Sequence, residues 1–223
     1  MRFSRYNSGM KITKYPQSCL LIESNGTRVL IDPGSFVAEK YTADLFGQID
    51  AVLITHEHSD HAHAQLIAAL KIGATKVYAN RSTKVLLGDL VTDIASDGQV
   101  LEIGTLKVTV RDLPHVDMVD GTPGPQNTGY VIDDVLFHPG DGVKIDGVTA
   151  AVGAIPIAGP DISPRDTFDL AKAIGCKVVI PIHYDYFLED PEVLVGEAQL
   201  RKLPFKVVPL KEGESYDTDN LVA

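Results

Sequence analysis

One short segment of the sequence concentrates side chains that can bind metal ions. Directly after the apolar run Ala51–Thr55 the chain reads His-Glu-His-Ser-Asp-His, which places four potential ligands at His56, His58, Asp60 and His61. In a turn that leaves a strand, His56 and His58 can point to one side. Asp60 and His61 would begin the following helix and can face a second position nearby. One segment can therefore supply two ligands to each of two ions, and imidazole with carboxylate suits zinc or another first-row metal.

Three further candidate ligands each follow another apolar run. They are His115 after Leu106–Leu113, Asp141 after Val135–His138, and His183 after Lys177–Ile180. Because strand ends can bring residues that are distant in the sequence to one edge of a sheet, we expect these side chains to join the first four on a rigid scaffold. Taken alone, each would more often be a hydrogen-bonded structural residue, and the first motif could be a solvated turn that caps a helix. The seven residues together favour a metal site.

A pair of metal ions in such a site would suit hydrolysis. Two ions about 3.5–4 Å apart can hold a hydroxide between them and lower the pKa of its parent water towards neutrality. The hydroxide attacks an electrophilic carbonyl or phosphorus, while the ions stabilise the developing oxyanion. Asp60 is the candidate catalytic residue, because it can orient the nucleophile as well as bind a metal. A histidine-rich set with open positions is typical of catalytic rather than structural sites.

The elements that must position these residues are predicted from apolar periodicity and turn signals. β-branched, apolar runs predict strands at Ser18–Glu23, Arg28–Asp32, Ala51–Thr55, Lys76–Ala79, Leu106–Leu113, Gly129–Asp133, Val135–His138, Val148–Ile155, Lys177–Ile180 and Phe205–Pro209. Helical signals predict helices at Asp60–Ile72, Ser82–Gly88, Pro164–Gly175 and Pro191–Lys202. Strands in both halves of the chain with helices between them indicate two sheets covered by helices, an α/β or α+β fold with a substantial β content.

The bulk properties bound the class of protein. A chain of 223 residues without a linker or repeat is expected to form a single domain, residues 1–223. No apolar run approaches the 18 or more residues of a membrane span, and the N-terminus has polar and charged residues where a signal peptide needs an apolar run. We therefore expect a cytoplasmic protein. Its oligomeric state is left open.

The net charge of the chain limits the classes of molecule that it is expected to bind. The formal net charge is −10, and the basic residues are scattered along the chain. Nucleic-acid surfaces need clustered Lys and Arg, so a nucleic-acid partner is not expected. Bound metal ions would add local positive charge, which keeps a small anionic substrate acceptable.

The chain has two cysteines, Cys19 and Cys176, each flanked by apolar residues. Two buried thiols in a reducing compartment are expected rather than a disulfide. Two cysteines are also too few for a cysteine-rich structural zinc site.

Several residues near the candidate ligands are open to two interpretations. Asp32, at a strand end, could form a turn or accept a hydrogen bond from a ligating imidazole, which such sites usually require. His138 could support the site or contact a substrate. Tyr184 and Tyr186 could line the pocket, although tyrosine at a strand end more often packs. His63 is expected on the surface of the helix or beside a ligand.

Two segments have less specific signals. The Gly- and Pro-rich stretch from Val116 to Asn127 is long for a plain connection and could edge the active site, together with its residues Asp117 and Asp120. The acidic end of the chain, from Glu212 to Asp219, is expected to be a solvated tail without a functional role.

The His-x-His-x-Asp-His motif and the later single ligands resemble the metallo-β-lactamase superfamily. The five motif segments occur in the order of that family over nearly the whole chain, and the resemblance implies its four-layer αββα sandwich. It also implies that a first metal is held by His56, His58 and His115. A second metal would be held by Asp60, His61 and His183, with Asp141 as the bridge between the two.

Three segments are most similar to a compact branch of this superfamily, which includes L-ascorbate-6-phosphate lactonase and many uncharacterised metal-dependent hydrolases. They are Gly129–Ile132, Phe137–Asp141 and Ile180–Tyr184. Pro139 stands where a small residue is expected and Gly142 where Thr is expected, which counts against the lactonase itself.

The ligand types narrow the function further. A glutamate at His58 would indicate the redox di-iron members, and a cysteine at Asp141 the antibiotic-hydrolysing members. We therefore expect a dinuclear hydrolase with a metal-bridging hydroxide, acting on a small ester, lactone or phosphoester. Zinc is the expected metal, and manganese or iron would suit the same ligands. The alternatives are a phosphodiesterase or ribonuclease of the same superfamily and a non-catalytic metal-binding sensor. The substrate is left open because one fold hosts many activities.

Overall fold

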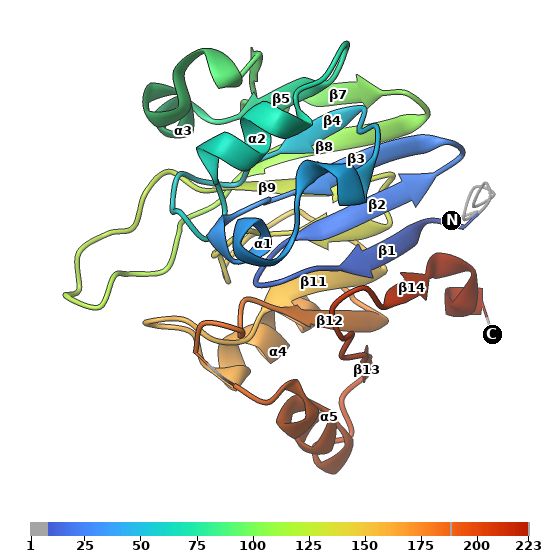
Figure 1. Ribbon diagram of the computed structural model, residues 1–223. Helices are drawn as coiled ribbons and strands as arrows, with labels where there is room; N and C mark the ends of the chain where they lie inside the picture. The colour runs from blue at the N-terminus through green and yellow to red at the C-terminus, as the bar shows by residue number, and fades with distance from the viewer. Residues whose placement is uncertain (1–8, 188, 223) are drawn as a thin grey trace.

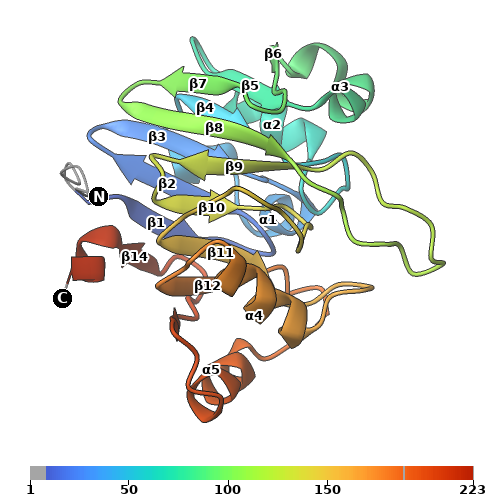
Figure 2. The same ribbon diagram turned by 180° about the vertical axis from the view of Figure 1, so that it is seen from behind.

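The computed structural model describes residues 9–187 and 189–222. Within these residues two seven-stranded sheets pack face to face, and helices cover the outer face of the first sheet and part of the outer face of the second (Figures 1 and 2). From edge to edge, the first sheet contains β14 (Ser215–Asp217), β1 (Lys11–Lys14), β2 (Leu20–Ser24), β3 (Thr27–Ile31), β4 (Ala51–Leu53), β5 (Lys76–Ala79) and β6 (Asp93–Ile94). The second contains β13 (Lys206–Val207), β12 (Val178–Ile182), β11 (Val152–Pro156), β10 (Leu136–His138), β9 (Thr128–Ile132), β8 (Leu106–Asp112) and β7 (Val100–Ile103).

The central strands β4 and β9 to β12 are buried on both faces, which explains their continuous apolar runs, whereas β7 and β8 alternate between buried and exposed residues. In β4, Ala51 and Leu53 face the core between the sheets, whereas Val52 faces the helices. In β2, Leu20 faces the inner core and Leu21 the outer one. The two-residue period of a strand thus fills two cores at once.

The helices form the two outer layers. They are α1 (Ser35–Lys40), α2 (Ala64–Leu70), α3 (Arg81–Leu87), α4 (Pro164–Ala173) and α5 (Pro191–Leu200), with short 3-10 helices η1 (Ala43–Phe46), η2 (Gly88–Leu90) and η3 (Thr218–Val222). Buried residues of α1, α2 and α3 share a core with the first sheet, and those of α4 and α5 share one with the second. In α2, the buried Leu66, Ile67 and Leu70 have the spacing of one helix face.

The expected fold class, an αββα sandwich, is confirmed. All ten predicted strand ranges overlap an observed strand, and the four predicted helices overlap α2 to α5. The best-marked helix, α4, has the expected capping box between Ser163 and Asp166 with Pro164 at its start. The strands and the α-helix that the sequence analysis did not predict are β1, β6, β7, β14 and α1, and the 3-10 helices η1 and η3 were not predicted either. All of them are at most six residues long, so their periodicity is weak.

Two expectations were wrong. The acidic end is not a solvated tail, because Ser215–Asp217 forms β14 and pairs antiparallel with β1. The first predicted helix was placed too early: α2 begins at Ala64, and Asp60 lies in the preceding turn. In that turn the backbone N–H of His61 donates to the carbonyl oxygen of His58 at 2.9 Å.

The cysteines are free and buried, as expected. Cys19 lies in the outer core of the first sheet and Cys176 in the outer core of the second, so the whole sandwich separates them. None of the helices in the described part of the chain combines the length and apolar character needed to cross a bilayer.

Candidate metal centre

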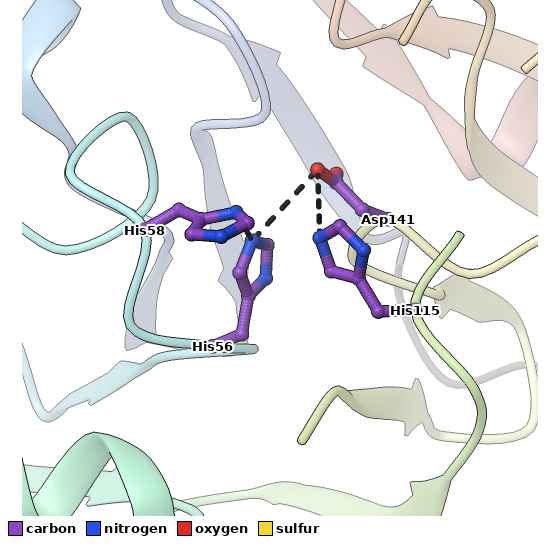
Figure 3. Close-up of side chains that lie close together, drawn as sticks. All are labelled: His56, His58, His115 and Asp141. Carbon is purple, nitrogen blue, oxygen red and sulfur yellow. Dashed lines mark hydrogen bonds and ion pairs between the residues drawn. The ribbon is translucent and has the colours of Figure 1, made fainter. Parts of the chain in front are cut away.

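The strand directions bring the candidate ligands to one place. In the second sheet, β8 and β10 are both antiparallel to β9, and β10 to β12 are parallel, so the carboxyl ends of β8, β10 and β12 share one edge. His115, Asp141 and His183 follow these three ends. The turn with His56 follows β4 of the first sheet. Figure 3 shows His56, His58, His115 and Asp141 pointing towards one another across the two sheets.

Two hydrogen bonds fix the end of β4 relative to the opposite sheet. The buried Tyr130 hydroxyl donates to the carbonyl oxygen of Ile54 at 2.8 Å. The backbone N–H of Thr128 donates to the carbonyl oxygen of Thr55 at 2.9 Å. Because both bonds lie immediately before His56, they hold the histidine motif in register with the ligands from the second sheet.

The first group of possible ligands is His56, His58, His115 and Asp141, with one ligand atom from each lying within 4.8 Å of the others. Nε2 of His56 is 3.7 Å from Oδ2 of Asp141, and Nε2 of His115 is 3.5 Å from the same oxygen. Nε2 of His56 is 3.1 Å from Nδ1 of His58. Three imidazoles and a carboxylate oxygen suit a divalent first-row metal ion.

The second group is Asp60, His61 and His183, whose ligand atoms also lie within 4.8 Å of one another. Nε2 of His183 is 3.3 Å from Oδ2 of Asp60, and Nε2 of His61 is 3.7 Å from it. The Asp141 carboxylate reaches this group too, with Oδ2 at 3.0 Å from Nε2 of His183 and Oδ1 at 3.3 Å from Nε2 of His61. Asp141 is therefore the side chain that the two groups share.

Three atoms of the cluster test whether metal ions fit. Nε2 of His61, Nε2 of His115 and Oδ1 of Asp141 are buried without a hydrogen-bond partner among the described residues. A buried polar atom left in this state costs about 1–3 kcal/mol. Since all three belong to the candidate ligand set and face its interior, bound cations would satisfy them. The donor set therefore fits divalent metal ions.

The opposite ring nitrogens of the histidines are already engaged. Nδ1 of His115 lies 2.6 Å from the carbonyl oxygen of Val116, and Nδ1 of His183 lies 2.7 Å from that of Ala158. Nδ1 of His61 lies 2.8 Å from Oδ2 of Asp32. A hydrogen bond at Nδ1 fixes the ring and leaves Nε2 to bind a metal.

Asp32 connects two parts of the motif, so of its two interpretations the hydrogen bond is present. Besides contacting His61, its carboxylate accepts hydrogen bonds from the backbone N–H and the hydroxyl of Thr55, both at 2.8 Å. The Thr55 hydroxyl also lies 3.0 Å from Nδ1 of His56. The fully buried Asp32 thereby orients imidazoles of both ligand groups.

The other residues of uncertain role take separate positions. The buried His138 donates from Nε2 to the carbonyl oxygen of Ser18 at 2.8 Å, and its Nδ1 accepts from the backbone N–H of Gly140 at 3.2 Å. It thus supports the turn before Asp141 and does not line the cavity. Tyr184 packs against the Lys14 ammonium, 4.5 Å from its ring centroid, and does not line the cavity, whereas Tyr186 does. His63 caps α2 by accepting a hydrogen bond from the backbone of that helix.

In the long connection between β8 and β9, Asp117 and Asp120 are exposed and do not line the cavity. Met118, between them, does line it. The expectation that this connection edges the site therefore holds for an apolar residue rather than for the acidic ones.

Burial and neighbouring charges move the pKa values of the cluster in opposite directions. Burial lowers the pKa of His56 well below its ordinary value, and the charge of His61 lowers it further. Burial alone would raise the pKa of the Asp141 carboxyl, but the charges of His183 and His61 hold it well below its usual range. Burial alone would lower the pKa of His183, but the charge of the Asp141 carboxylate outweighs burial and raises this pKa to about 10. Asp141 is thus ionised, and its neighbourhood must contain positive charge, from protons or from metal ions.

Sequence reasoning missed Gln17, which holds the second ligand group in place. Its side-chain amide donates to Oδ2 of Asp60 at 2.9 Å, and its backbone carbonyl accepts from the N–H of His183 at 3.1 Å. Its own N–H donates to Asp185 at 2.6 Å. Asp185 in turn forms an ion pair with the buried Lys14 at 3.2 Å. No local spacing signals these contacts, because each joins segments more than 40 residues apart.

The departure at Gly142 has a steric cause. A Cβ atom there would lie 2.5 Å from the side chain of Leu113 and 2.9 Å from the carbonyl oxygen of Pro114, so Thr would not fit without a shift of the backbone. The carbonyl oxygen of Pro139 accepts a hydrogen bond from the Asn127 side chain at 2.8 Å, which anchors the turn that presents Asp141.

A cavity of about 420 Å³ opens above both ligand groups. It is lined by Ser35, Phe36, His58, Ser59, Asp60, His115, Met118, Asp141, Pro160, His183, Tyr186 and Phe187. Its volume is in the range of small-molecule sites.

Comparisons with known proteins agree with this geometry. A family model described as "Beta-lactamase superfamily domain" matches residues 11–183. The chain is 32% identical to a UPF0173 protein from Pyrococcus furiosus, over 93% of this chain and 100% of that one. It is 29% identical to a UPF0173 metal-dependent hydrolase from Methanopyrus kandleri with the same coverage. A metallo hydrolase from Ignicoccus hospitalis has a similar structure, with a TM-score of 0.75 and 23% identity over 94% of this chain and 98% of that one.

Gln17→Asn tests the positioning of Asp60. Asparagine tolerates the positive φ of +59° at this position but is too short to reach Asp60. We expect zinc affinity at the second group to fall by about 10–100-fold, as for other residues that orient metal ligands. The measurement is a zinc titration of the metal-free protein against a competing chelator. The exposed Gln199→Asn is the matched control, and unchanged affinities in Gln17→Asn would contradict the assignment.

Proposed function

Because the chain belongs to the metallo-β-lactamase superfamily, we propose that its seven clustered side chains bind two divalent metal ions and hydrolyse a small ester, lactone or phosphoester. At the level of class, the chain is a metal-dependent hydrolase. The observation that carries the finer proposal is the position of Asp141. Its carboxylate lies within 3.7 Å of imidazoles from both ligand groups, and one of its oxygens is buried without a hydrogen-bond partner in the described chain.

The proposed ligand sets follow the two groups. His56, His58 and His115 would hold one ion, Asp60, His61 and His183 the other, and Asp141 would be shared. Zinc suits this combination of imidazole and carboxylate, and manganese or iron would also be accepted. When bound, the pair would supply Lewis acidity and lower the pKa of a water molecule so that it becomes a nucleophile.

Asp60 is the proposed catalytic residue. It lines the cavity, and its side chain, 24% exposed, is more open than that of Asp141 at 5%. Burial alone would raise the pKa of its carboxyl, but the charge of His61 and the hydrogen bond with His183 hold it well below its usual range. An ionised, weakly basic carboxylate held by Gln17 accepts a hydrogen bond from water and orients it, rather than storing a proton.

The alternatives receive less support. A phosphodiesterase or ribonuclease needs cationic side chains along the path of its polyanionic substrate. None of the described residues that line the cavity is Lys or Arg. A sensor would not need a cavity open to a small molecule above both ligand groups.

Elemental analysis tests the two-metal proposal. We expect about two divalent ions per purified chain and turnover of p-nitrophenyl esters or bis-p-nitrophenyl phosphate. His58→Ala removes a ligand of the first group and should lose at least one ion together with activity. His63→Asn, which keeps a helix cap outside the cluster, should retain both ions. Activity in His58→Ala equal to that of the unmodified protein would exclude this mechanism.

Asp60→Asn tests the proposed role of Asp60 as both a metal ligand and an acceptor for water. Loss of the charged acceptor should lower kcat by about a hundredfold or more, because the water is no longer oriented and the second group loses a charged ligand. The first ligand group is untouched, so at least one ion should remain by elemental analysis. A kcat within about twofold of the unmodified value would remove Asp60 from the reaction.

A further inference from the structure

The cavity above the ligand cluster has two chemically different sides. Its charged and imidazole residues all belong to the candidate ligand set, and its remaining polar residues are Ser35 and Ser59. The other lining residues are apolar or aromatic, and we call them the apolar wall: Phe36, Met118, Pro160, Tyr186 and Phe187.

The aromatic part of the apolar wall is continuous with the ligand cluster. The rings of His183 and Phe187 lie 5.8 Å apart between centroids, those of Phe187 and Tyr186 5.0 Å, and those of Tyr186 and Phe36 5.9 Å. The last two pairs meet edge to face, at interplanar angles of 83° and 74°. Such ring pairs stabilise one another, so the three aromatic residues form a single surface that begins at a candidate ligand.

A backbone hydrogen bond connects the apolar wall to the ligand cluster. The N–H of Tyr186 donates to Oε1 of Gln17 at 3.2 Å, and Nε2 of the Gln17 side chain donates to Asp60. Gln17 therefore positions both the loop that contains Tyr186 and Phe187, which we call the aromatic loop, and the carboxylate of Asp60. Tyr186 as a residue is nevertheless 65% exposed, and it does not belong to any of the buried cores. An exposed tyrosine beside two half-buried phenylalanines on the rim of a cavity is typical of a ligand-binding surface.

The wall offers no partner for a charged group. No Lys or Arg is among the described residues that line the cavity. The nearby Lys14 has a side chain only 1% exposed and already forms an ion pair with Asp185. With a net charge of −10 for the chain, an anionic substituent on this side would lose its hydration without compensation.

We propose that the substrate is an uncharged carboxylic ester or lactone with an aromatic or branched aliphatic group that lies on the apolar wall, an inference that rests on the hydrolytic function proposed above. In the reaction, water adds to the carbonyl carbon and the bond from that carbon to the alkoxy oxygen breaks. The alkoxy oxygen leaves with a proton, which yields the carboxylic acid and the alcohol. The apolar group selects the substrate, and the carbonyl faces the ligand cluster.

The first test measures binding without turnover. Titration calorimetry of the zinc-loaded protein compares phenylacetohydroxamate, acetohydroxamate and phenyl phosphate. We expect phenylacetohydroxamate to bind on the order of tenfold more tightly than acetohydroxamate. The reason is that part of its phenyl ring is removed from contact with water when it packs against the apolar wall. Tyr186→Ala and Phe36→Ala should each reduce this ratio to below about threefold. Leu200→Ala, at an exposed apolar position on α5 that does not line the cavity, should leave the ratio unchanged.

The second test measures turnover of p-nitrophenyl phenylacetate, p-nitrophenyl acetate and bis-p-nitrophenyl phosphate by the same four proteins. A higher kcat/KM for the phenylacetate that falls in Tyr186→Ala supports the inference. Equal hydroxamate affinities, a preference for phenyl phosphate, or faster cleavage of the phosphodiester would overturn it while leaving a hydrolase in place. If no substrate is cleaved but the aryl preference depends on Tyr186, the hydrolytic function fails and the apolar subsite stands.

Discussion

The cluster of candidate ligands is arranged around one buried carboxylate, that of Asp141. Asp141 is 4% exposed, and its ion-pair contacts in the described chain are all with imidazoles: those of His56, His61, His115 and His183. Burying a charge without compensation is very costly, and histidines that are neutral cannot provide the compensation. The cluster therefore needs positive charge, which protonated imidazoles or bound cations can provide, and in the proposed function two divalent ions would supply it beside the unpartnered ring nitrogens.

The arrangement of the two sheets brings the other candidate ligands close to the Asp141 carboxylate. Strand ends from one sheet carry Asp141, His115 and His183, and a strand end from the other carries the histidine motif. Around them, Asp32, Gln17 and backbone carbonyls hold the rings and carboxylates by hydrogen bonds, so little reorganisation is needed when a metal binds. The aromatic loop after His183 then gives the opposite side of the cavity an apolar character. In the function proposed above, neighbouring residues would therefore divide metal binding from substrate selection.

Features that depend on local patterns could be predicted from the sequence, whereas contacts between distant segments could not. The histidine motif and the strand ends before His115, Asp141 and His183 could be read because ligand spacing and apolar runs are local patterns. Gln17 could not, since its contact with Asp60 spans 43 positions and follows no periodicity. The pairing of β14 with β1 brings together residues about 200 positions apart, and an acidic segment gives no local sign of it. The start of α2 was misplaced because a tight turn at His58 and a histidine cap resemble the first turn of a helix.

Anomalous X-ray diffraction from crystals of the zinc-loaded protein, collected on both sides of the zinc edge, tests the central claim most directly. The account predicts two anomalous peaks about 3.5–4 Å apart, one beside His115 and one beside His183, with the Asp141 carboxylate between them. A single peak, or two peaks of which neither contacts Asp141, would contradict it.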